Sequence, residues 1–234
     1  HEVRKRITQA CADAGLNVLT VPSLEDLVAG RVSVSSLRRV ELDDLLGRDL
    51  VELDDSGLHR LLTGQVVMVT GAGGSIGAEL CRQIARFAPA KLVLFEQSEL
   101  ALYAMEQELP QRFAGLQIAP VIGDVKNAVW VNQVMAEHRP AVVFHAAAYK
   151  HVPLMENANA WEAVRNNVLG TQVVAAAAQA HGVGKFVMIS TDKAVNPTNV
   201  MGATKRLAEM ACQAMQQPTG TRFVSVRFGN VLGS

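Results

Sequence analysis

The chain has 234 residues, and its 22 Lys and Arg residues balance 22 Asp and Glu residues, which excludes the surplus positive charge typical of proteins that bind nucleic acids or anionic membranes. Hydrophobic residues make up 49% of the chain and charged residues 19%, a composition that predicts a globular fold and excludes a disordered chain. The three cysteines, Cys11, Cys81 and Cys212, form no CxxC pair, so neither a metal site nor a disulfide framework is expected.

Residues 1–63 are expected to form an N-terminal segment and linker. Their pattern predicts a helix over 3–14, a strand over 17–21 and a short helix over 24–29, followed by acidic, Leu-rich sequence. We interpret them as the remnant of a preceding α/β unit that leads into a linker. No signal peptide opens the chain at His1, and no apolar stretch is long enough to cross a bilayer, so we expect a soluble, cytoplasmic segment of a longer protein.

Residues 64–234 alternate short β-branched runs with longer helical patterns, which is typical of βαβ units. The predicted strands cover residues 66–70, 91–95, 117–122, 141–146, 185–190 and 222–227. The helical patterns between them cover residues 76–87, 100–113, 129–138, 161–181 and 201–216. These elements predict an α/β fold with a doubly wound, Rossmann-type parallel sheet.

A glycine-rich segment, TGAGGSIG, lies between the first strand and the first helix of this region. Gly71, Gly74 and Gly77 are three residues apart, although Ile76 breaks the strict GxGxxG pattern. Without Cβ atoms the turn is tight, and free N–H groups at the helix start face an anion such as a pyrophosphate. The alternative is a merely tight strand-to-helix turn. The residues predicted to bind a dinucleotide here are Gly71, Gly74, Ser75, Ile76 and Gly77.

Two further strands end in carboxylates. Glu96 ends the second strand, where it can accept hydrogen bonds from the adenosine ribose, and Gln97 follows it where an arginine would favour NADP. We therefore predict NAD. Asp124 and Val125, after the third strand, are predicted to contact the adenine. The alternative for both carboxylates is a solvated strand end.

The segment HAAAYKHVPLMEN follows the fourth strand. His145 is expected to be a core histidine bonded to the backbone. Lys150 and His151 lie just beyond the strand, where open α/β sheets bind ligands. The three alanines after His145 are small enough for a flat ring or a phosphate to approach the end of the strand. We therefore predict that Ala146, Ala147 and Ala148 contact the cofactor.

After the fifth strand come Thr191, Asp192 and Lys193, and then a helix that carries Met201 and Lys205. The order TGxxGxxG, GDV, HAAA, NVxGT, STDK and a helix-borne lysine resembles the extended short-chain dehydrogenase/reductases. More narrowly, HAAAYKHVPLMEN together with STDKAVNPTNVMGATK resembles the CapD-type nucleotide-sugar 4,6-dehydratases of polysaccharide biosynthesis. The resemblance covers residues 64–234 and implies that the chain stops before the substrate domain.

The resemblance implies NAD as a recycled hydride carrier and a UDP-N-acetylhexosamine substrate, with UDP-N-acetylglucosamine favoured. The product would be a 4-keto-6-deoxy sugar nucleotide for surface polysaccharides. It also implies a homo-oligomer and a full-length protein anchored at the cytoplasmic face of the bacterial inner membrane, with no nucleic-acid partner.

The resemblance also implies roles for single residues. Lys205 would hold the nicotinamide ribose, Asp192 would protonate the departing 6-hydroxyl, Lys193 would be the base at carbon 5, and Thr191 would bind the 4-oxygen. A polar loop that caps the next helix, with Asn199 as its cap, is the alternative for this cluster. The residues expected to contact substrate are Lys150, His151, Asn167 and Asn230, with Asn167 expected either to fix a helix kink or to order a catalytic water.

Met201 occupies the position of the superfamily's catalytic tyrosine, and methionine cannot exchange a proton. One interpretation is lost activity, which leaves a dinucleotide-binding module. The other is that acid/base work has moved to the STDK residues, as in a branch of these dehydratases. A 4-epimerase of the same superfamily remains an alternative, and a purely structural protein is the least favoured one.

Overall fold

The computed structural model describes residues 19–20, 38–39, 54–229 and 231. By its internal contacts the chain divides into two compact units, His1–Leu53 and Asp54–Ser234. In the first unit, strand β1 (Leu19–Thr20) pairs antiparallel with β2 (Arg38–Arg39). Part of the predicted strand over 17–21 is thus present. The helices predicted over 3–14 and 24–29 lie outside the described residues.

Helix α4 (Asp55–Leu62) begins the described part of the second unit and was not expected from the sequence. The Asp54 carboxylate caps it by accepting a hydrogen bond from the Gly57 N–H, and Leu62 at its end is 2% exposed. Burial of Leu62 among core residues places α4 with the sheet. The domain division between residues 63 and 64 stays a prediction.

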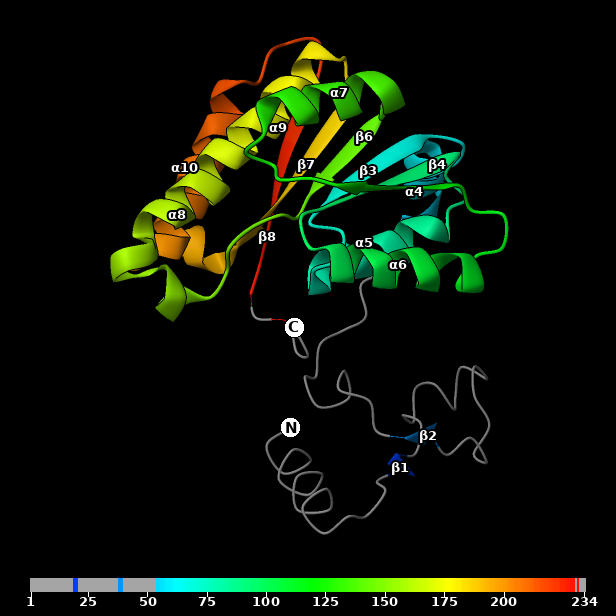
Figure 1. The fold of residues 1–234 in the computed structure, drawn as a ribbon, viewed down its shortest axis with the longest axis horizontal. Helices are drawn as coiled ribbons and strands as arrows, with labels where there is room; N and C mark the ends of the chain where they lie inside the picture. The colour runs from blue at the N-terminus through cyan, green and yellow to red at the C-terminus, as the bar shows by residue number, and fades with distance from the viewer. Residues whose placement is uncertain (1–18, 21–37, 40–53, 230, 232–234) are drawn as a thin grey trace. The chain divides into compact units, whose positions relative to one another are not determined.

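The second unit contains a six-stranded, all-parallel sheet with the order β5-β4-β3-β6-β7-β8, which confirms the doubly wound α/β fold (Figure 1). The strand order reverses between β3 and β6, so the crevice for a ligand is expected outside the carboxyl ends of these two strands. The strands agree with the predicted ones to within a residue or two at each end. They are β3 (Val66–Thr70), β4 (Lys91–Glu96), β5 (Ile118–Ile122), β6 (Val142–His145), β7 (Lys185–Thr191) and β8 (Arg222–Phe228).

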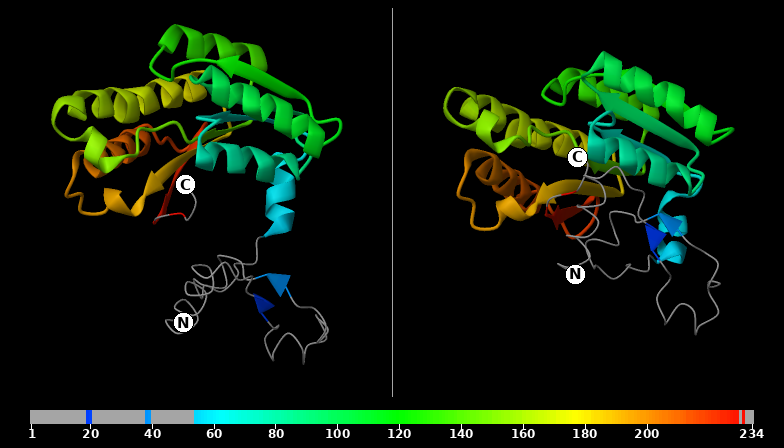
Figure 2. Two further views of the ribbon diagram at one scale, coloured as in Figure 1. Left: turned by 60° about the horizontal axis from the view of Figure 1, so that its bottom comes forward. Right: turned by 90° about the horizontal axis from the view of Figure 1, so that it is seen from below.

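Two helical layers cover the faces of this sheet, as Figure 1 shows and Figure 2 repeats from two further directions. Alternate residues of β3 point into different cores: Val67 and Val69 pack with α4, α5 and α6, whereas Met68 packs with α7, α9 and α10. Burial on both faces explains why these strands are continuously apolar. The helices are α5 (Ser75–Ala85), α6 (Glu99–Arg112), α7 (Ala128–His138), α8 (Ala160–Val164), α9 (Gly170–Ala180) and α10 (Val200–Ala214).

The single helix predicted over residues 161–181 is interrupted by a π-helical turn, η3 (Arg165–Leu169), between α8 and α9. Such turns widen a helix locally and are frequent at functional sites. Short 3-10 turns, η1 (Val152–Met155) and η4 (Asp192–Ala194), follow β6 and β7. Among the described residues, no helix combines the length and the apolar character needed to cross a membrane.

Candidate active site

The glycine turn between β3 and α5 is held by backbone packing. Gly71 has a φ of +67°, which favours glycine, and a Cβ there would lie 2.7 Å from the Ala147 Cα. A Cβ on Gly77 would lie 1.9 Å from the Gly71 carbonyl oxygen. Gly74 is the N-cap of α5 and contributes no side-chain hydrogen bond. The first N–H groups of α5 therefore lie next to the turn, where they can bind an anion.

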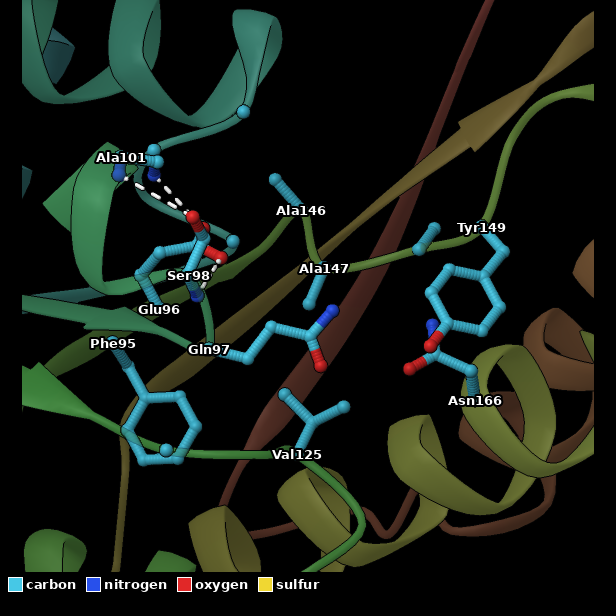
Figure 3. Close-up of a pocket in the computed structure, with 15 residues that line it drawn as sticks. Phe95, Glu96, Gln97, Ser98, Ala101, Val125, Ala146, Ala147, Tyr149 and Asn166 are labelled. Atoms are coloured by element: carbon cyan, nitrogen blue, oxygen red, sulfur yellow. Dashed lines mark hydrogen bonds between the residues drawn. The ribbon is translucent and has the colours of Figure 1, made fainter. Parts of the chain in front are cut away.

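The Glu96 carboxylate lies at the end of β4, beside this turn, and is 8% exposed. It accepts hydrogen bonds from the backbone N–H groups of Gly73 and Ser98, each 3.0 Å long. The cavity beside Glu96 has a volume of about 270 Å³. Figure 3 shows Glu96 and Tyr149 on its two sides, with the side chain of Gln97 between Ala147 and Val125. The fixed carboxylate faces a space that suits the adenosine ribose.

Gly73 has a role that sequence reasoning missed. Its N–H binds Glu96, and a Cβ on it would lie 2.4 Å from the Cβ of Ala101 in α6. The signal was present in the sequence, because Gly73 is the one glycine of the segment outside the three-residue spacing. Gly73 joins the turn to both the Glu96 carboxylate and α6.

The carboxyl edge of the sheet carries a cleft made of three adjoining cavities that share lining residues. The first is the cavity beside Glu96, the second lies over the turn and the start of α5, and the third lies between η1, β7 and α10. Ala146, Ala148 and Tyr149 line all three. Lys150 and His151 line the second and third cavities, on the side predicted for the substrate. The structure thus brings Lys150 and His151 to the same edge as the glycine turn.

The third cavity, about 420 Å³ in volume, contains most of the predicted catalytic residues. Thr191, Lys193, Met201 and Lys205 line it. Asp192 does not: its side chain is 59% exposed, and its carboxylate accepts hydrogen bonds from the Thr191 hydroxyl (3.0 Å) and the Lys193 ammonium (3.5 Å). The Thr191 hydrogen bond is the largest cause that lowers the pKa of Asp192, with Lys193 adding to it.

Lys205 is almost fully buried in α10, with 5% of its surface exposed. Its ammonium donates a 2.6 Å hydrogen bond to the Ile189 carbonyl oxygen in β7. Burial lowers the pKa of Lys205 to about 8, and the negative charge of Glu209 opposes that shift. The ammonium therefore stays protonated at neutral pH but is close to titration.

Met201, in the first turn of α10, is 4% exposed and packs in a small apolar cluster with Met155 and Ala163. Tyr149 packs against the same cluster. Met201 is thus part of the wall that joins η1 and α8 to α10. Asn199 caps α10 by accepting a hydrogen bond from the Gly202 N–H, which confirms the predicted cap.

Asn167 was predicted to contact substrate, but it has no exposed surface. Its amide lies in the π-helical turn η3, accepts a hydrogen bond from the Tyr149 N–H (2.8 Å), and donates to the Tyr149 carbonyl (2.9 Å) and the Thr204 hydroxyl (3.0 Å). The prediction of a direct substrate contact is corrected, because these partners occupy the amide. The alternative expectation, a role in the helix irregularity, agrees with its position in η3.

His145 is buried as predicted, but its partners are hydroxyls and not the backbone. Nδ1 lies 2.7 Å from Thr70 Oγ1, and Nε2 lies 2.9 Å from Thr171 Oγ1. Since the Thr171 hydroxyl donates to the Asn167 carbonyl, it accepts from Nε2–H, and the Thr70 hydroxyl donates to Nδ1. Burial lowers the pKa of His145 to about 3. We call this connected set the buried polar chain: Thr70, His145, Thr171, Asn167 and Thr204.

The remaining predicted residues divide between the cleft and its surroundings. Val125 lines the first cavity. Asp124 does not line it, since its carboxylate binds the Lys126 N–H and ammonium, each at 2.9 Å. Its contact with the adenine stays a prediction. Asn230 lies outside the described residues.

Comparisons with known proteins agree with this architecture. Residues 67–234 match the family described as "Polysaccharide biosynthesis protein". The capsular polysaccharide biosynthesis protein CapD of Staphylococcus aureus is 51% identical over 230 residues, which cover 97% of this chain and 38% of that protein. A UDP-N-acetylglucosamine 4,6-dehydratase (inverting) of Campylobacter jejuni is 34% identical over 178 residues, covering 74% of this chain and 51% of that protein.

Among solved structures, the X-ray structure of Pen from Bacillus thuringiensis is similar with a TM-score of 0.68 and 35% sequence identity. The match covers 74% of this chain and 54% of that chain. The present chain therefore spans between about two fifths and about half of the length of these three relatives.

Proposed function

The chain belongs to the polysaccharide biosynthesis protein family, and from this membership and the cleft we propose that it is the cofactor-binding half of an NAD-dependent nucleotide-sugar 4,6-dehydratase. The observation that carries the proposal is that the cavity beside the glycine turn and Glu96 shares lining residues with the cavity of Thr191, Lys193 and Lys205. A binding module alone would have no use for two lysines at the far end of that cleft.

The residues at the first two cavities fit NAD. The turn leaves no room for side chains at Gly71 and Gly77, so a pyrophosphate can approach the N–H groups that begin α5. The Glu96 carboxylate is already oriented by two backbone hydrogen bonds and can accept hydrogen bonds from two ribose hydroxyls. A 2′-phosphate would meet this negative charge, which favours NAD over NADP.

When bound, NAD would supply a hydride acceptor that is restored at the end of the reaction. Lys205 would bind the nicotinamide ribose and stabilise the negative charge that develops on the 4-oxygen of the sugar as the proton of the 4-hydroxyl leaves to solvent. Lys193 would remove the proton from carbon 5, which the adjacent ketone acidifies. Lys150 and His151 line the wall opposite β7 and would contact the sugar nucleotide.

Asp192 would protonate the 6-hydroxyl as it leaves. An acid needs a pKa near the working pH, yet the Thr191 hydroxyl lowers the pKa of Asp192. If Thr191 instead donates to the 4-oxygen of the sugar, Asp192 loses the largest cause of that shift and becomes a better acid. Thr191 would thus couple the first step to the elimination.

The sugar proposed is UDP-N-acetylglucosamine, which the name of the Campylobacter jejuni relative gives as that enzyme's substrate. The proposal extends to the expected surroundings of the full-length protein. These are a role in surface polysaccharide synthesis, a homo-oligomeric state and membrane anchoring at the cytoplasmic face of the inner membrane. We expect poor turnover by this chain alone, because the resemblance places the uridine contacts in the substrate domain.

The test incubates the chain with NAD and UDP-N-acetylglucosamine and follows the product by mass spectrometry. Dehydration lowers the mass by one water, whereas a 4-epimerase leaves the mass unchanged. Calorimetry with NAD alone separately measures cofactor binding. A chain that binds NAD but leaves the sugar intact, even when joined to its natural C-terminal continuation, would contradict the dehydratase proposal.

Variants then assign the roles. Asp192→Asn should abolish elimination because the transferable proton is lost, while Asp55→Asn, an exposed carboxylate in α4, should not. Lys193→Met should abolish solvent-deuterium exchange at carbon 5, with Lys91→Met as its matched control. Retained exchange in Lys193→Met would exclude Lys193 as the base.

A further inference from the structure

A buried carboxylate that no step above uses lies behind the third cavity. Glu209 of α10 has no exposed surface. Its two oxygens accept hydrogen bonds from Ser190 Oγ in β7 (2.6 Å) and from Arg227 Nε (2.8 Å) and Nη2 (2.5 Å) in β8, and Arg206 approaches at 3.3 Å. One carboxylate therefore ties together a helix and two neighbouring strands.

The same face of α10 binds β7 twice. Lys205 donates to the carbonyl of Ile189, and Glu209, one turn later, accepts from the hydroxyl of Ser190. Two successive residues of the strand are thus held by two side chains of opposite charge on the helix. Thr191, the first residue of the proposed catalytic segment, follows directly.

Arg227 has the equivalent position on β8. It forms a bidentate pair with Glu209, and the next two residues, Phe228 and Gly229, line the third cavity. A bidentate pair fixes both distance and orientation. The carboxylate of Glu209 therefore holds the residues that directly precede the ends of β7 and β8 beside the cavity, although Glu209 itself does not line it.

We propose that Glu209 is a positioning residue of this site: through Ser190 and Arg227 it fixes the strand ends that carry the proposed catalytic segment and the opposite wall, and its charge balances the buried ammonium of Lys205. The contacts of Glu209 with Ser190 and Arg227 are seen in the structure. The catalytic consequence rests on the proposed function.

The charge of Glu209 changes the pKa of Lys205 in a defined direction. Burial lowers the pKa of Lys205 to about 8, whereas Glu209 and, to a smaller extent, Cys212 raise it. Other charged or titratable groups that face Lys205 are His145 of β6, which is neutral at pH 7 because its pKa is about 3, and the cavity-lining Lys150, His151 and Lys193. Without the charge of Glu209, the pKa of Lys205 falls further, so the ammonium loses its proton at a lower pH.

The first experiment measures this titration directly and needs no enzymatic activity. The chain is labelled with 13C-lysine, the Lys205 signal is assigned by its loss in Lys205→Arg, and its chemical shift is followed with pH by NMR. In Glu209→Gln the midpoint should fall by about one pH unit, a tenfold weaker proton affinity. Arg206→Gln removes the longest of the four contacts and should leave the midpoint unchanged.

A second variant protects the test against misfolding, because removal of one partner of a buried pair leaves the other charge uncompensated. Glu209→Gln combined with Arg227→Gln replaces the ion pair by two amides and should restore the fold while the lowered Lys205 midpoint remains. An unchanged midpoint in a folded Glu209 variant would overturn the proposal.

The catalytic consequence is read from the pH profile of the dehydratase assay, with the protein joined to its natural C-terminal continuation. The alkaline limb of kcat should move to lower pH in Glu209→Gln and stay in place in Arg206→Gln, while the dissociation constant of NAD changes less than twofold. An unmoved limb would contradict the role in catalysis. A chain with the NMR shift but no dehydration would instead contradict the proposed function and leave the placement of Glu209 supported.

Discussion

The glycine turn and the buried polar chain both lie beside the cleft, but different forces hold them. At the turn, the Gly71 carbonyl lies so close to Gly77 that an added Cβ would be 1.9 Å away. In the polar chain, His145 and Asn167 are fully buried and all of their side-chain polar atoms have partners. An added side-chain atom at the turn should therefore destabilise the fold. In the polar chain, a lost hydrogen bond or an added proton should do so.

The largest effect is expected from adding one methyl group at the turn. Gly77→Ala forces a Cβ into the Gly71 carbonyl, which is backbone and cannot rotate away. We expect a loss of at least about 3 kcal/mol of unfolding free energy, by urea titration, and no measurable NAD binding.

Gly74→Ala is the matched control for this prediction. Its Cβ would lie 3.4 Å from the same carbonyl, an ordinary contact, so we expect a change below about 1 kcal/mol. Equal destabilisation by both alanines would show that steric exclusion is not what distinguishes the turn.

The next effect concerns protonation of the polar chain. His145 has a pKa of about 3 in the folded protein against an ordinary value of 6.5, so the unfolded state binds more protons between these values and stability falls as the pH drops through that window. Between pH 6.5 and pH 4 this contribution is about 3 kcal/mol. Unfolding titrations should show a smaller acid loss in His145→Gln than in the parent chain, and an unaltered loss in His181→Gln, which changes an exposed histidine.

Removal of hydrogen bonds from the polar chain should have a somewhat smaller effect. Asn167→Ala leaves the backbone N–H and carbonyl of Tyr149 without their partner and removes one of the two hydrogen bonds of the Thr204 hydroxyl, which should cost about 2 kcal/mol of unfolding free energy. Asn132→Ala, which removes an exposed amide on α7, should cost less than about 0.5 kcal/mol. Similar losses for both would mean that η3 is not held by this amide.

The smallest effect returns to the nucleotide end of the cleft. Glu96→Gln removes the negative charge from the ribose site and weakens at least one of its orienting hydrogen bonds, so the NAD dissociation constant should rise about tenfold, or about 1.4 kcal/mol. Calorimetry should show a smaller loss of affinity for NADP. Glu99→Gln, two residues beyond Gln97 on α6, should leave both affinities unchanged.

The same contrast explains which parts could be predicted from the sequence. The six strands were found because burial on both faces makes each a short β-branched run, and the turn and Glu96 stood out because a glycine pattern follows one strand and a carboxylate ends the next. Helix α4 was missed because its first residues, Asp55 to Gly57, look like an acidic linker until the capping role of Asp54 is seen.

The polar chain and Glu209 could not be found in this way. Asn167 and Thr204 are 37 residues apart, and Thr70 and His145 are 75 apart, so only the folded arrangement reveals that they are partners. An asparagine in a helix is equally consistent with a substrate contact and with a buried clamp. Asp192 was expected in the cleft because it follows the fifth strand within the STDK segment, but adjacent residues at a strand exit point in different directions.

Gly202 has a practical consequence for protein engineering. A Cβ at this position would lie 2.2 Å from the carbonyl oxygen of Lys193, so the beginning of α10 rests directly on the backbone of the segment that contains Asp192. Libraries of variants around Met201 that aim to alter substrate choice should therefore keep glycine at position 202 and vary the residues beside it.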